Sequence, residues 1–457
     1  MKIEFLGAAR TVTGSMHLIE TNTKKILIDC GLFQGSKNLT EQNRNRLNFK
    51  LDEIDCVILS HAHIDHSGLI PLLCKKGYNG KIFATPVTSE LCRIMLADCG
   101  KLQEEDANWE RKHIGISSGA MPLYTMDDAI SCMHYFEIID YSETFEIDDV
   151  KFRFLDAGHI LGSGTVEIFL ENNKIVFSGD IGRAHVPILK EPVAPEDANV
   201  LIIESTYGDT IHPDIKTTER IFLDIIKRTM KNGGNLIIPA FSIGRTQHIL
   251  YLLNNFIENK LLKDLEVYVD SPLAISATEI YSKYSRYFDE ETQALIEKGD
   301  LPFEFHSLKF TRSVEESKEI NNISRNAIII SASGMCSGGR VLHHLKHNLP
   351  RDCCTVLFVG YQAEGTLGRI LLNKPKTVKI HNEIITVNAN IEYMPAFSAH
   401  ADQKELLSWL RCMKSKPKKI YIVHGEEKTS SVLARKINEE FGLKADIPMM
   451  NEVVSIM

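Results

Sequence analysis

Hydrophobic residues along the first 207 positions fall into short apolar runs separated by glycine, asparagine and aspartate. Such runs predict β-strands. Residues 56–59 form one of them and predict a buried strand, and the leucines and isoleucine that follow predict a helix over residues 68–77. The other predicted strands are 2–6, 16–20, 25–29, 81–84, 152–155, 165–170, 175–178 and 200–203, with a helix at 88–102. Residues 103–140 are polar and mixed, which predicts a lid or a packing excursion.

From about residue 208 the pattern changes to a regular alternation of amphipathic helices and apolar strands. The predicted elements are helices at 217–231, 245–257, from near 275, and at 339–349, with strands at 236–239, 265–269, 327–330 and 355–359. Alternation of this kind is typical of a mainly parallel sheet with helices on both faces. A strand-like run at 386–394, a helix at 403–413, a strand at 419–423 and a helix at 428–441 then return the chain to the first domain. The pattern therefore predicts one domain inserted into another.

Composition narrows the class of protein. A chain of 457 residues with 44% hydrophobic and 25% charged residues is globular and long enough for two domains. The formal net charge of −8 counts against broad electrostatic binding to polyanions, although a metal-lined cleft could still present local positive charge. The ten cysteines include no C-x-x-C pair, and no apolar stretch is long enough to cross a membrane. We therefore expect a cytoplasmic protein without a membrane partner.

Candidate chemistry is concentrated in the loop after the predicted strand 56–59. His61, His63, Asp65 and His66 lie within six positions there. Neutral imidazoles and a carboxylate are zinc ligands, and so many from one short loop suit two metal ions better than one. The alternative is a polar surface loop that is rich in histidine by chance.

Further candidates follow other predicted strands. Asp29 ends the strand 25–29, and His159 and Asp180 lie on glycine-bracketed loops after the strands 152–155 and 175–178. An aspartate before glycine, such as Asp29, is on its own more often a cap or turn residue than a catalytic group. A carboxylate such as Asp180 has two oxygens and is suited to bridging two cations. Glu204 and His424 directly follow the predicted strands 200–203 and 419–423, and His400 lies in the loop after the strand-like run 386–394.

The sequence His61-Ala62-His63-Ile64-Asp65-His66 resembles the His-x-His-x-Asp-His signature of the metallo-β-lactamase superfamily. Glu204, Ser-Ala-His400 and Val-His424-Gly resemble motifs A, B and C of its β-CASP branch. The resemblance implies an α/β fold, a metallo-β-lactamase αββα sandwich with an inserted β-CASP α/β domain. The expected boundaries are 1–207 and 376–457 for the sandwich and 208–375 for the insertion.

The β-CASP branch consists of nucleases, and histidine at motif C is typical of its RNA-acting members. The resemblance therefore implies a zinc-dependent ribonuclease that hydrolyses phosphodiester bonds with two zinc ions. Its ligands would be His61, His63 and His159 for one ion and Asp65, His66 and His424 for the other, with Asp180 between them. Asp29 would orient the metal loop, and Glu204 with His400 would protonate the leaving oxygen.

Several loops of the insertion are candidates for phosphate contacts, because glycine-bearing loops before helices present backbone N–H groups. The candidate residues are Ser333, Gly334, Arg245, Arg340 and Arg369. As bare glycine loops they are more often simple turns. The insertion predicts single-stranded RNA as the preferred partner. The absence of further domains before residue 1 or far beyond His424 favours an endonuclease, and a homodimer is compatible with the sequence.

Three alternative functions are compatible with parts of this pattern. A small-molecule hydrolase acting on an ester or thioester is disfavoured by the inserted domain, which a small substrate would not need. A DNA-acting β-CASP nuclease is disfavoured by His424. A silent binding subunit is disfavoured because every expected metal ligand is present.

Overall fold

The computed structural model describes residues 1–457 apart from 36, 48, 115–119, 171–172 and 457, and it contains two compact units. The first unit comprises Met1–Ala184, Glu191–Ile211 and His400–Met457, and the second comprises His185–Lys190 and His212–Ala399. One unit is thus inserted into the other, which agrees with the predicted fold class. Within the described residues, none of the helices combines the length and the apolar character that a membrane crossing requires.

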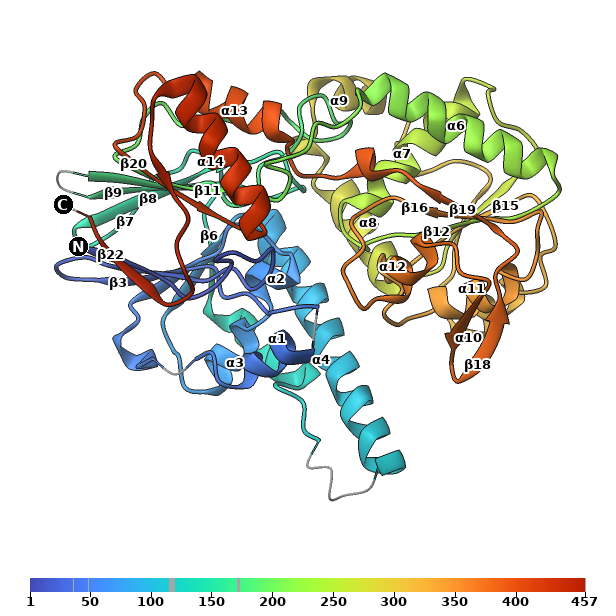
Figure 1. Ribbon diagram of the computed structural model, residues 1–457, viewed down its shortest axis with the longest axis horizontal. Helices are drawn as coiled ribbons and strands as arrows, with labels where there is room; N and C mark the ends of the chain where they lie inside the picture. The colour runs from blue at the N-terminus through green and yellow to red at the C-terminus, as the bar shows by residue number, and fades with distance from the viewer. Residues whose placement is uncertain (36, 48, 115–119, 171–172, 457) are drawn as a thin grey trace. The chain divides into compact units, whose positions relative to one another are not determined.

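The first unit is built on two seven-stranded sheets. In spatial order, one sheet contains β22 (Glu452–Ser455), β1 (Lys2–Phe5), β2 (His17–Glu20), β3 (Lys25–Ile28), β4 (Cys56–Ile58), β5 (Lys81–Ala84) and β6 (Phe136–Ile138). The other contains β21 (Ala445–Asp446), β20 (Lys419–Val423), β11 (Val200–Glu204), β10 (Asn173–Phe177), β9 (Gly164–Leu170), β8 (Val150–Asp156) and β7 (Phe145–Ile147). In Figure 1 the sheet with β7, β8 and β9 lies above the sheet with β3 and β22.

The two sheets pack face to face through buried apolar side chains. Phe5 and Ile58 of one sheet share a buried cluster with Phe154, Ile168 and Ile202 of the other. All five side chains are at most 2% exposed. The sandwich core is therefore continuous between the sheets.

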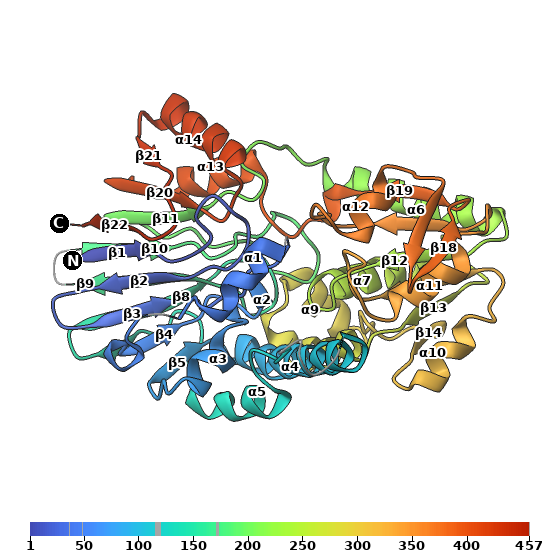
Figure 2. The ribbon, with the colours of Figure 1, turned by 60° about the horizontal axis from the view of Figure 1, so that its bottom comes forward.

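Helices cover the outer faces of this sandwich. The cluster of α13 (Gln403–Cys412) and α14 (Glu427–Phe441) with β11 and β20 joins Leu406, Leu410 and Leu433 to Ile203 and Ile422. Figure 2 shows these helices on the side of the second sheet. The remaining helices are α1 (Lys37–Glu41), α2 (Ile64–Ser67), α3 (Ile70–Lys75), α4 (Pro86–Ile114) and α5 (Met126–Cys132).

Several elements of this unit were not predicted from the sequence or differ from the prediction, and two of them show why. Helix α4 continues to Ile114 instead of ending at 102, because residues 101–114 contain neither glycine nor proline and are rich in helix-forming side chains. Strand β22 was not predicted, and it pairs antiparallel with β1, with Ile3 opposite Val454. Strand β22 has only four residues, which is too short to give a clear periodic signal in the sequence. Its pairing with β1 depends on tertiary packing.

The second unit is a parallel α/β layer structure. Its six-stranded sheet has the order β14 (Leu308–Phe310), β13 (Glu266–Val269), β15 (Ala327–Ser331), β12 (Leu236–Pro239), β16 (Thr355–Phe358) and β19 (Asn390–Tyr393), and each neighbouring pair is parallel. Its helices are α6 (Ile215–Lys231), α7 (Arg245–Glu258), α8 (Pro272–Lys283), α9 (Glu290–Glu297), α10 (Val314–Ile320), α11 (Val341–Asn348) and α12 (Leu367–Leu372), and β17 (Thr377–Ile380) pairs with β18 (Glu383–Thr386).

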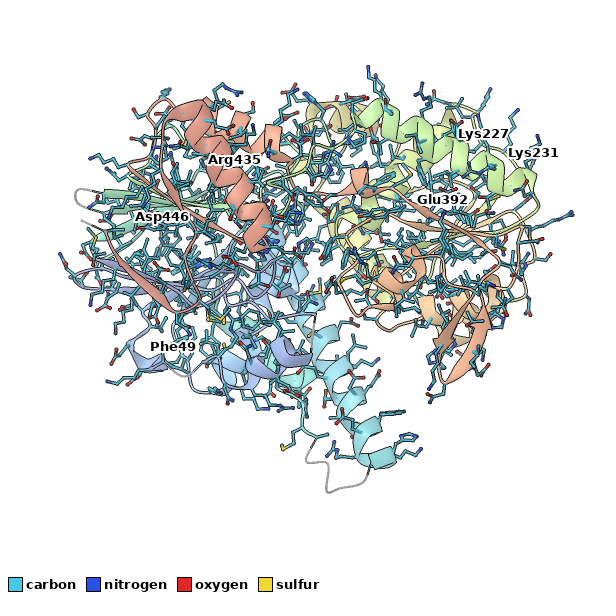
Figure 3. All side chains as sticks on the ribbon, in the orientation of Figure 1. Phe49, Lys227, Lys231, Glu392, Arg435 and Asp446 are labelled. Carbon is cyan, nitrogen blue, oxygen red and sulfur yellow. The ribbon has the colours of Figure 1, made fainter. Side chains whose placement is uncertain are left out.

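Helix α6 shows how the predicted amphipathic pattern is used. Its buried positions recur every three or four residues, which places them on one face. On the other face, Lys227 and Lys231 are exposed and extend away from the ribbon (Figure 3). The buried residues are Thr218, Phe222, Ile225, Ile226 and Thr229.

The second unit extends further along the chain than the expected boundary at 375. Strand β19 pairs parallel with β16, with Phe358 opposite Tyr393, so the segment up to Ala399 belongs to the second unit. The expectation that residues 386–394 form a strand of the first domain is therefore wrong. An apolar run predicts a strand but does not show which sheet it joins.

A buried aspartate organises the second unit. Both oxygens of Asp270 are used: Oδ1 accepts hydrogen bonds from Arg340 Nη1 at 2.8 Å and Thr311 Oγ1 at 2.7 Å, and Oδ2 accepts one from Ser317 Oγ at 2.6 Å. The ring atom Nε2 of the buried His344 lies 2.6 Å from Oδ2. Burial would raise the pKa of Asp270, but these partners outweigh burial and lower the pKa from its ordinary value to about 2.

Replacing Asp270 by asparagine should destabilise the protein by about 3 kcal/mol at pH 7, because it leaves a half-buried guanidinium without its carboxylate. The folded-state pKa is below the unfolded-state value, so the ionised carboxyl contributes stability that is present above pH 4 and is lost as the pH falls towards about 2. Urea denaturation of wild type and variant should therefore give curves that converge over this interval. The exposed Asp224→Asn in α6 is the control, and a constant difference between Asp270→Asn and wild type from pH 7 to pH 2 would contradict the argument.

Candidate metal centre

The candidate ligands all lie in the first unit, on loops that follow strands. The loop after β4 carries His61 and His63, the helix α2 that follows it carries Asp65 and His66, and single ligands follow β8, β10 and β20. Strand β3 is parallel to β4, and β10, β11 and β20 are parallel to one another. Because parallel strands end at the same edge of a sheet, these loops bring their side chains together. His159 follows β8, Asp180 follows β10 and His424 follows β20.

The first group of ligand atoms converges around one oxygen of Asp180. Its Oδ2 lies 3.5 Å from Nε2 of His61 and 3.5 Å from Nε2 of His159. The Nδ1 atom of His63 lies 3.1 Å from Nε2 of His61 and 3.2 Å from Nε2 of His159. His61, His63, His159 and Asp180 thus offer four ligand atoms within 4.8 Å of one another.

The second group forms around the other oxygen of Asp180. Oδ1 lies 3.3 Å from Nε2 of His66 and 3.5 Å from Nδ1 of His424. The Nε2 atom of His424 lies 3.2 Å from that of His66 and 3.5 Å from Oδ2 of Asp65. Asp180 therefore presents one oxygen to each group, as a bridging carboxylate does.

These residues fit divalent metal ions. Burial lowers the pKa of His61 and His159 well below the ordinary value and lowers the pKa of His63 to about 4, so their rings are neutral at pH 7 and present lone pairs. Oδ1 of Asp180 is buried without a hydrogen-bond partner in the described structure. Neutral imidazoles and carboxylates that converge on one point are the donor set that zinc prefers.

A third group overlaps with the first two. Asp180, Glu204, His400 and His424 also offer ligand atoms within 4.8 Å of one another. His400 and Glu204 lie close together, with Nδ1 of His400 3.2 Å from Oε1 and 3.3 Å from Oε2. Backbone N–H groups of Ile181 and Thr206 donate to Glu204 at 2.7 and 3.2 Å. Its carboxylate is thus fixed beside the ring of His400.

The electrostatic surroundings favour a protonated His400. Burial by itself lowers the pKa of this ring. The carboxylates of Glu204 and Asp180 outweigh burial and raise the pKa of His400 to about 9. A ring with this pKa carries its proton at neutral pH.

Asp29 lies beneath the metal loop and contacts it at several points. Its carboxylate accepts hydrogen bonds from the backbone N–H of Ser60 at 2.8 Å and from the hydroxyls of Ser60 and Ser15 at 3.0 Å each. Nδ1 of His66 lies 2.6 Å from Oδ2 of Asp29. Asp29 has φ of 58°, a left-handed conformation that turns the chain towards the loop. Contacts of this kind orient a ligand ring.

The sequence analysis missed three residues that support the site. Ser60 contacts Asp29, and Oγ1 of Thr206 lies 3.0 Å from Nδ1 of His424. Arg46 donates at 2.8 Å to each of the carbonyl oxygens of Leu6, Gly14 and Gly31. The positions of Ser60 before His61 and of Thr206 after Glu204 were the only sequence signals, and Arg46 had none.

Gly31 explains why the neighbouring loops pack so closely. A Cβ at this position would lie 1.7 Å from the carbonyl oxygen of Asp65. The close approach of the Asp65 backbone therefore requires glycine at position 31. The same carbonyl oxygen of Asp65 accepts a hydrogen bond of 2.7 Å from the backbone N–H of Ser15, which ties the loop before β2 to the segment after β4.

The five phosphate candidates lie in the second unit, at the carboxyl ends of its strands and the starts of its helices. Arg245 begins α7 and is 8% exposed, while Arg369 of α12 is exposed. Arg340 donates to Asp270 and to the carbonyl oxygens of Thr311 and Arg312. These bonds commit its guanidinium to the scaffold. Ser333 and Gly334 lie in the loop after β15.

Comparison with known domains divides the chain into three parts. Residues 9–89 match the metallo-β-lactamase superfamily, residues 246–371 match the β-CASP domain, and residues 384–448 match the Zn-dependent metallo-hydrolase RNA specificity domain. The last match includes both His400 and His424.

Known proteins resemble the chain over its whole length. Ribonuclease TTHA0252 of Thermus thermophilus is 36% identical over 95% of each chain, and the RNase J-like protein of Methanocaldococcus jannaschii is 33% identical over 99% of each. The transcription termination factor FttA of the same archaeon is 30% identical over 100% of this chain and 72% of its own length. A solved protein of unknown function from Enterococcus faecalis V583 shares the fold with a TM-score of 0.55, at 12% identity and over 99% of each chain.

Proposed function

The chain belongs to the β-CASP family of metallo-β-lactamase-fold hydrolases, and from this membership we propose that it is a metal-dependent ribonuclease that hydrolyses the phosphodiester bonds of RNA. The observation that carries the proposal is Asp180, whose two oxygens each face a separate group of ligand atoms. A small ester or thioester as substrate has no comparable support.

We propose two zinc ions as the cofactors. His61, His63 and His159 would hold one, Asp65, His66 and His424 the other, and Asp180 would bind both. When bound, the ions would lower the pKa of a water molecule and stabilise the charge that develops on the phosphate oxygens during hydrolysis. Asp29 would keep the ring of His66 in its ligating orientation through the contact of 2.6 Å.

Glu204 and His400 would supply the proton for the leaving group. Glu204 holds Nδ1 of the imidazolium, so Nε2 is the ring atom from which the proton moves to the leaving 3′ oxygen. The side chain of His400 is 20% exposed, whereas that of Asp180 is 2% exposed, so His400 lies on the side of the site that a substrate can reach.

Purified protein should contain two zinc ions per chain. Elemental analysis measures this directly, and dialysis against a chelator should remove the metal together with activity while zinc restores both. A ratio near one, or trace metal after mild purification, would contradict the assignment of two ligand groups.

Activity on defined substrates tests the function itself. End-labelled single-stranded RNA should be cut at internal positions, and cutting should require metal. A perfect RNA duplex should be cut much more slowly, because a second strand hinders the approach of a phosphate to side chains as buried as Asp180. Equal cutting of both would contradict the preference, cleavage from one end only would contradict an endonuclease, and faster cutting of DNA would favour a DNA-acting enzyme.

The cellular setting is also proposed. All ten cysteines are free thiols, which supports the reducing cytoplasm expected from the sequence. A homodimer remains a prediction that sedimentation of the purified protein would test.

A further inference from the structure

We propose that Phe241 and Tyr361 form a stacking surface for the unpaired bases of RNA at the carboxyl edge of the parallel sheet in the second unit. The inference rests on the proposed ribonuclease function and adds a binding surface outside the metal centre. Phe241 is 41% exposed and Tyr361 is 40% exposed, although both side chains are large and aromatic.

The sheet brings these residues to one place. Phe241 follows β12 and Tyr361 follows β16, and these strands are parallel neighbours with Leu236 opposite Thr355. Continuing this register brings Phe241 level with Gly360, directly before Tyr361. The carboxyl edge of a parallel sheet is where ligands of α/β proteins bind.

The ring of Phe241 rests on glycines. A Cβ on Gly334, in the loop after β15, would lie 3.2 Å from Cδ2 of Phe241, and one on Gly360 would lie 3.6 Å from Cε2. The side-chain amide of the buried Gln362 donates to the carbonyl oxygens of Gly334 at 3.0 Å and Gly360 at 3.1 Å. These two hydrogen bonds hold both loops in place. The ring of Phe241 is therefore supported on the edge that faces Gly334 and Gly360, and it remains partly open to solvent.

The loop after β15 is also tied to the start of α12, which carries an exposed cation. Gly368 N donates to the carbonyl oxygen of Met335 at 3.1 Å, which ties the start of α12 to the loop that carries Gly334. The exposed Arg369 follows directly and can contact a phosphate. Aromatic rings beside a cation are the composition of surfaces that bind single strands.

Charge explains why stacking would matter for this chain. A protein with a net charge of −8 gains little from general attraction to a polyanion. Stacking on an aromatic ring does not depend on net charge and tolerates every base, because each base has a π-face. The exposed rings would thus supply affinity for RNA without selecting a sequence.

Equilibrium binding separates stacking from electrostatic attraction. The full chain is titrated in chelator, which prevents cleavage, against a fluorescent oligouridylate and against an abasic ribose-phosphate oligomer of equal length and charge. Wild type should bind the base-bearing oligomer more tightly. Phe241→Leu and Tyr361→Leu should each weaken that binding by about tenfold and leave the abasic oligomer unaffected, whereas Phe241→Tyr should retain wild-type affinity.

Ile384→Ala is the matched control, because Ile384 is an apolar side chain of the same unit that is 78% exposed. It should not change either affinity. Thermal unfolding shows whether each leucine variant is folded, and Tyr361→Leu still tests the proposal if Phe241→Leu is not. Equal weakening on both oligomers, or no weakening, would overturn the stacking surface while metal-dependent cleavage by wild type still supports the ribonuclease. If wild type neither binds nor cuts RNA, both proposals are wrong.

Discussion

Replacing Asp180 by asparagine should reduce RNA hydrolysis by more than about 10²-fold and lower the zinc content below two ions per chain. Removing a group that merely orients a ligand typically costs ~10–100-fold in metal affinity or activity. Asp180 is proposed to bind both ions directly, so its loss should cost more. Asparagine keeps the size of the side chain but has one oxygen and no charge, so it cannot bridge two cations. Steady-state cleavage rates and elemental analysis of the same preparation measure both effects.

The control for this variant is Asp197→Asn, which removes an exposed carboxylate that pairs with Lys174 in the same unit. It should keep both zinc content and rate. If Asp180→Asn retains two zinc ions and most of its activity, the two groups of ligands are not joined by this residue and the bridging assignment is wrong.

Replacing His400 by alanine should lower the rate on ordinary RNA by ~10²–10⁴-fold, the usual contribution of general acid catalysis, while zinc content stays at the wild-type value. The reason is that His400 is assigned to proton transfer, with Glu204 beside its ring. An RNA whose leaving 3′ oxygen is replaced by sulfur needs no protonation. The variant should therefore cut that substrate almost as fast as wild type does.

His134→Ala provides the matched control, because His134 is an exposed histidine of the first unit whose Nδ1 lies 3.0 Å from the carbonyl oxygen of Ser131. It should behave as wild type on both substrates. Loss of zinc from His400→Ala would instead assign His400 to the third ligand group with Asp180, Glu204 and His424. An equal loss of rate on the sulfur substrate would indicate a phosphate contact.

The local parts of the centre were predictable from the sequence, because one short loop carries four candidate ligands. His61, His63, Asp65 and His66 lie within six positions, so no long-range information was needed to group them. His159, Asp180 and His424 were expected through a family resemblance, and the structure brings them to the same loop. Arg46 could not be found in this way, because an arginine that binds carbonyl oxygens of two other loops, 15 to 40 positions away, leaves no periodic or spacing signal.

The fold shows the same limit. The alternation of helices and strands after residue 208 predicted the parallel sheet, because the spacing of hydrophobic residues within each element can be read from a short stretch of sequence. It did not show that β19 joins that sheet or that β22 joins β1, because both depend on which partner is nearby. Arg340 illustrates the limit for side chains: its phosphate contact stays a prediction, and the buried Asp270 to which it donates lies 70 positions away in sequence, beyond the reach of any local pattern.

The pairing of β22 with β1, and of β11 with β20, has a consequence for biosynthesis. On the ribosome the second unit, nearly all within His212–Ala399, is released before His400–Met457 and can begin to fold while that segment is still being made. The sandwich must then wait for β20 and β22, whose partners were synthesised hundreds of residues earlier. His424 emerges with them, so the nascent chain cannot assemble the candidate metal centre until residue 424 has been translated.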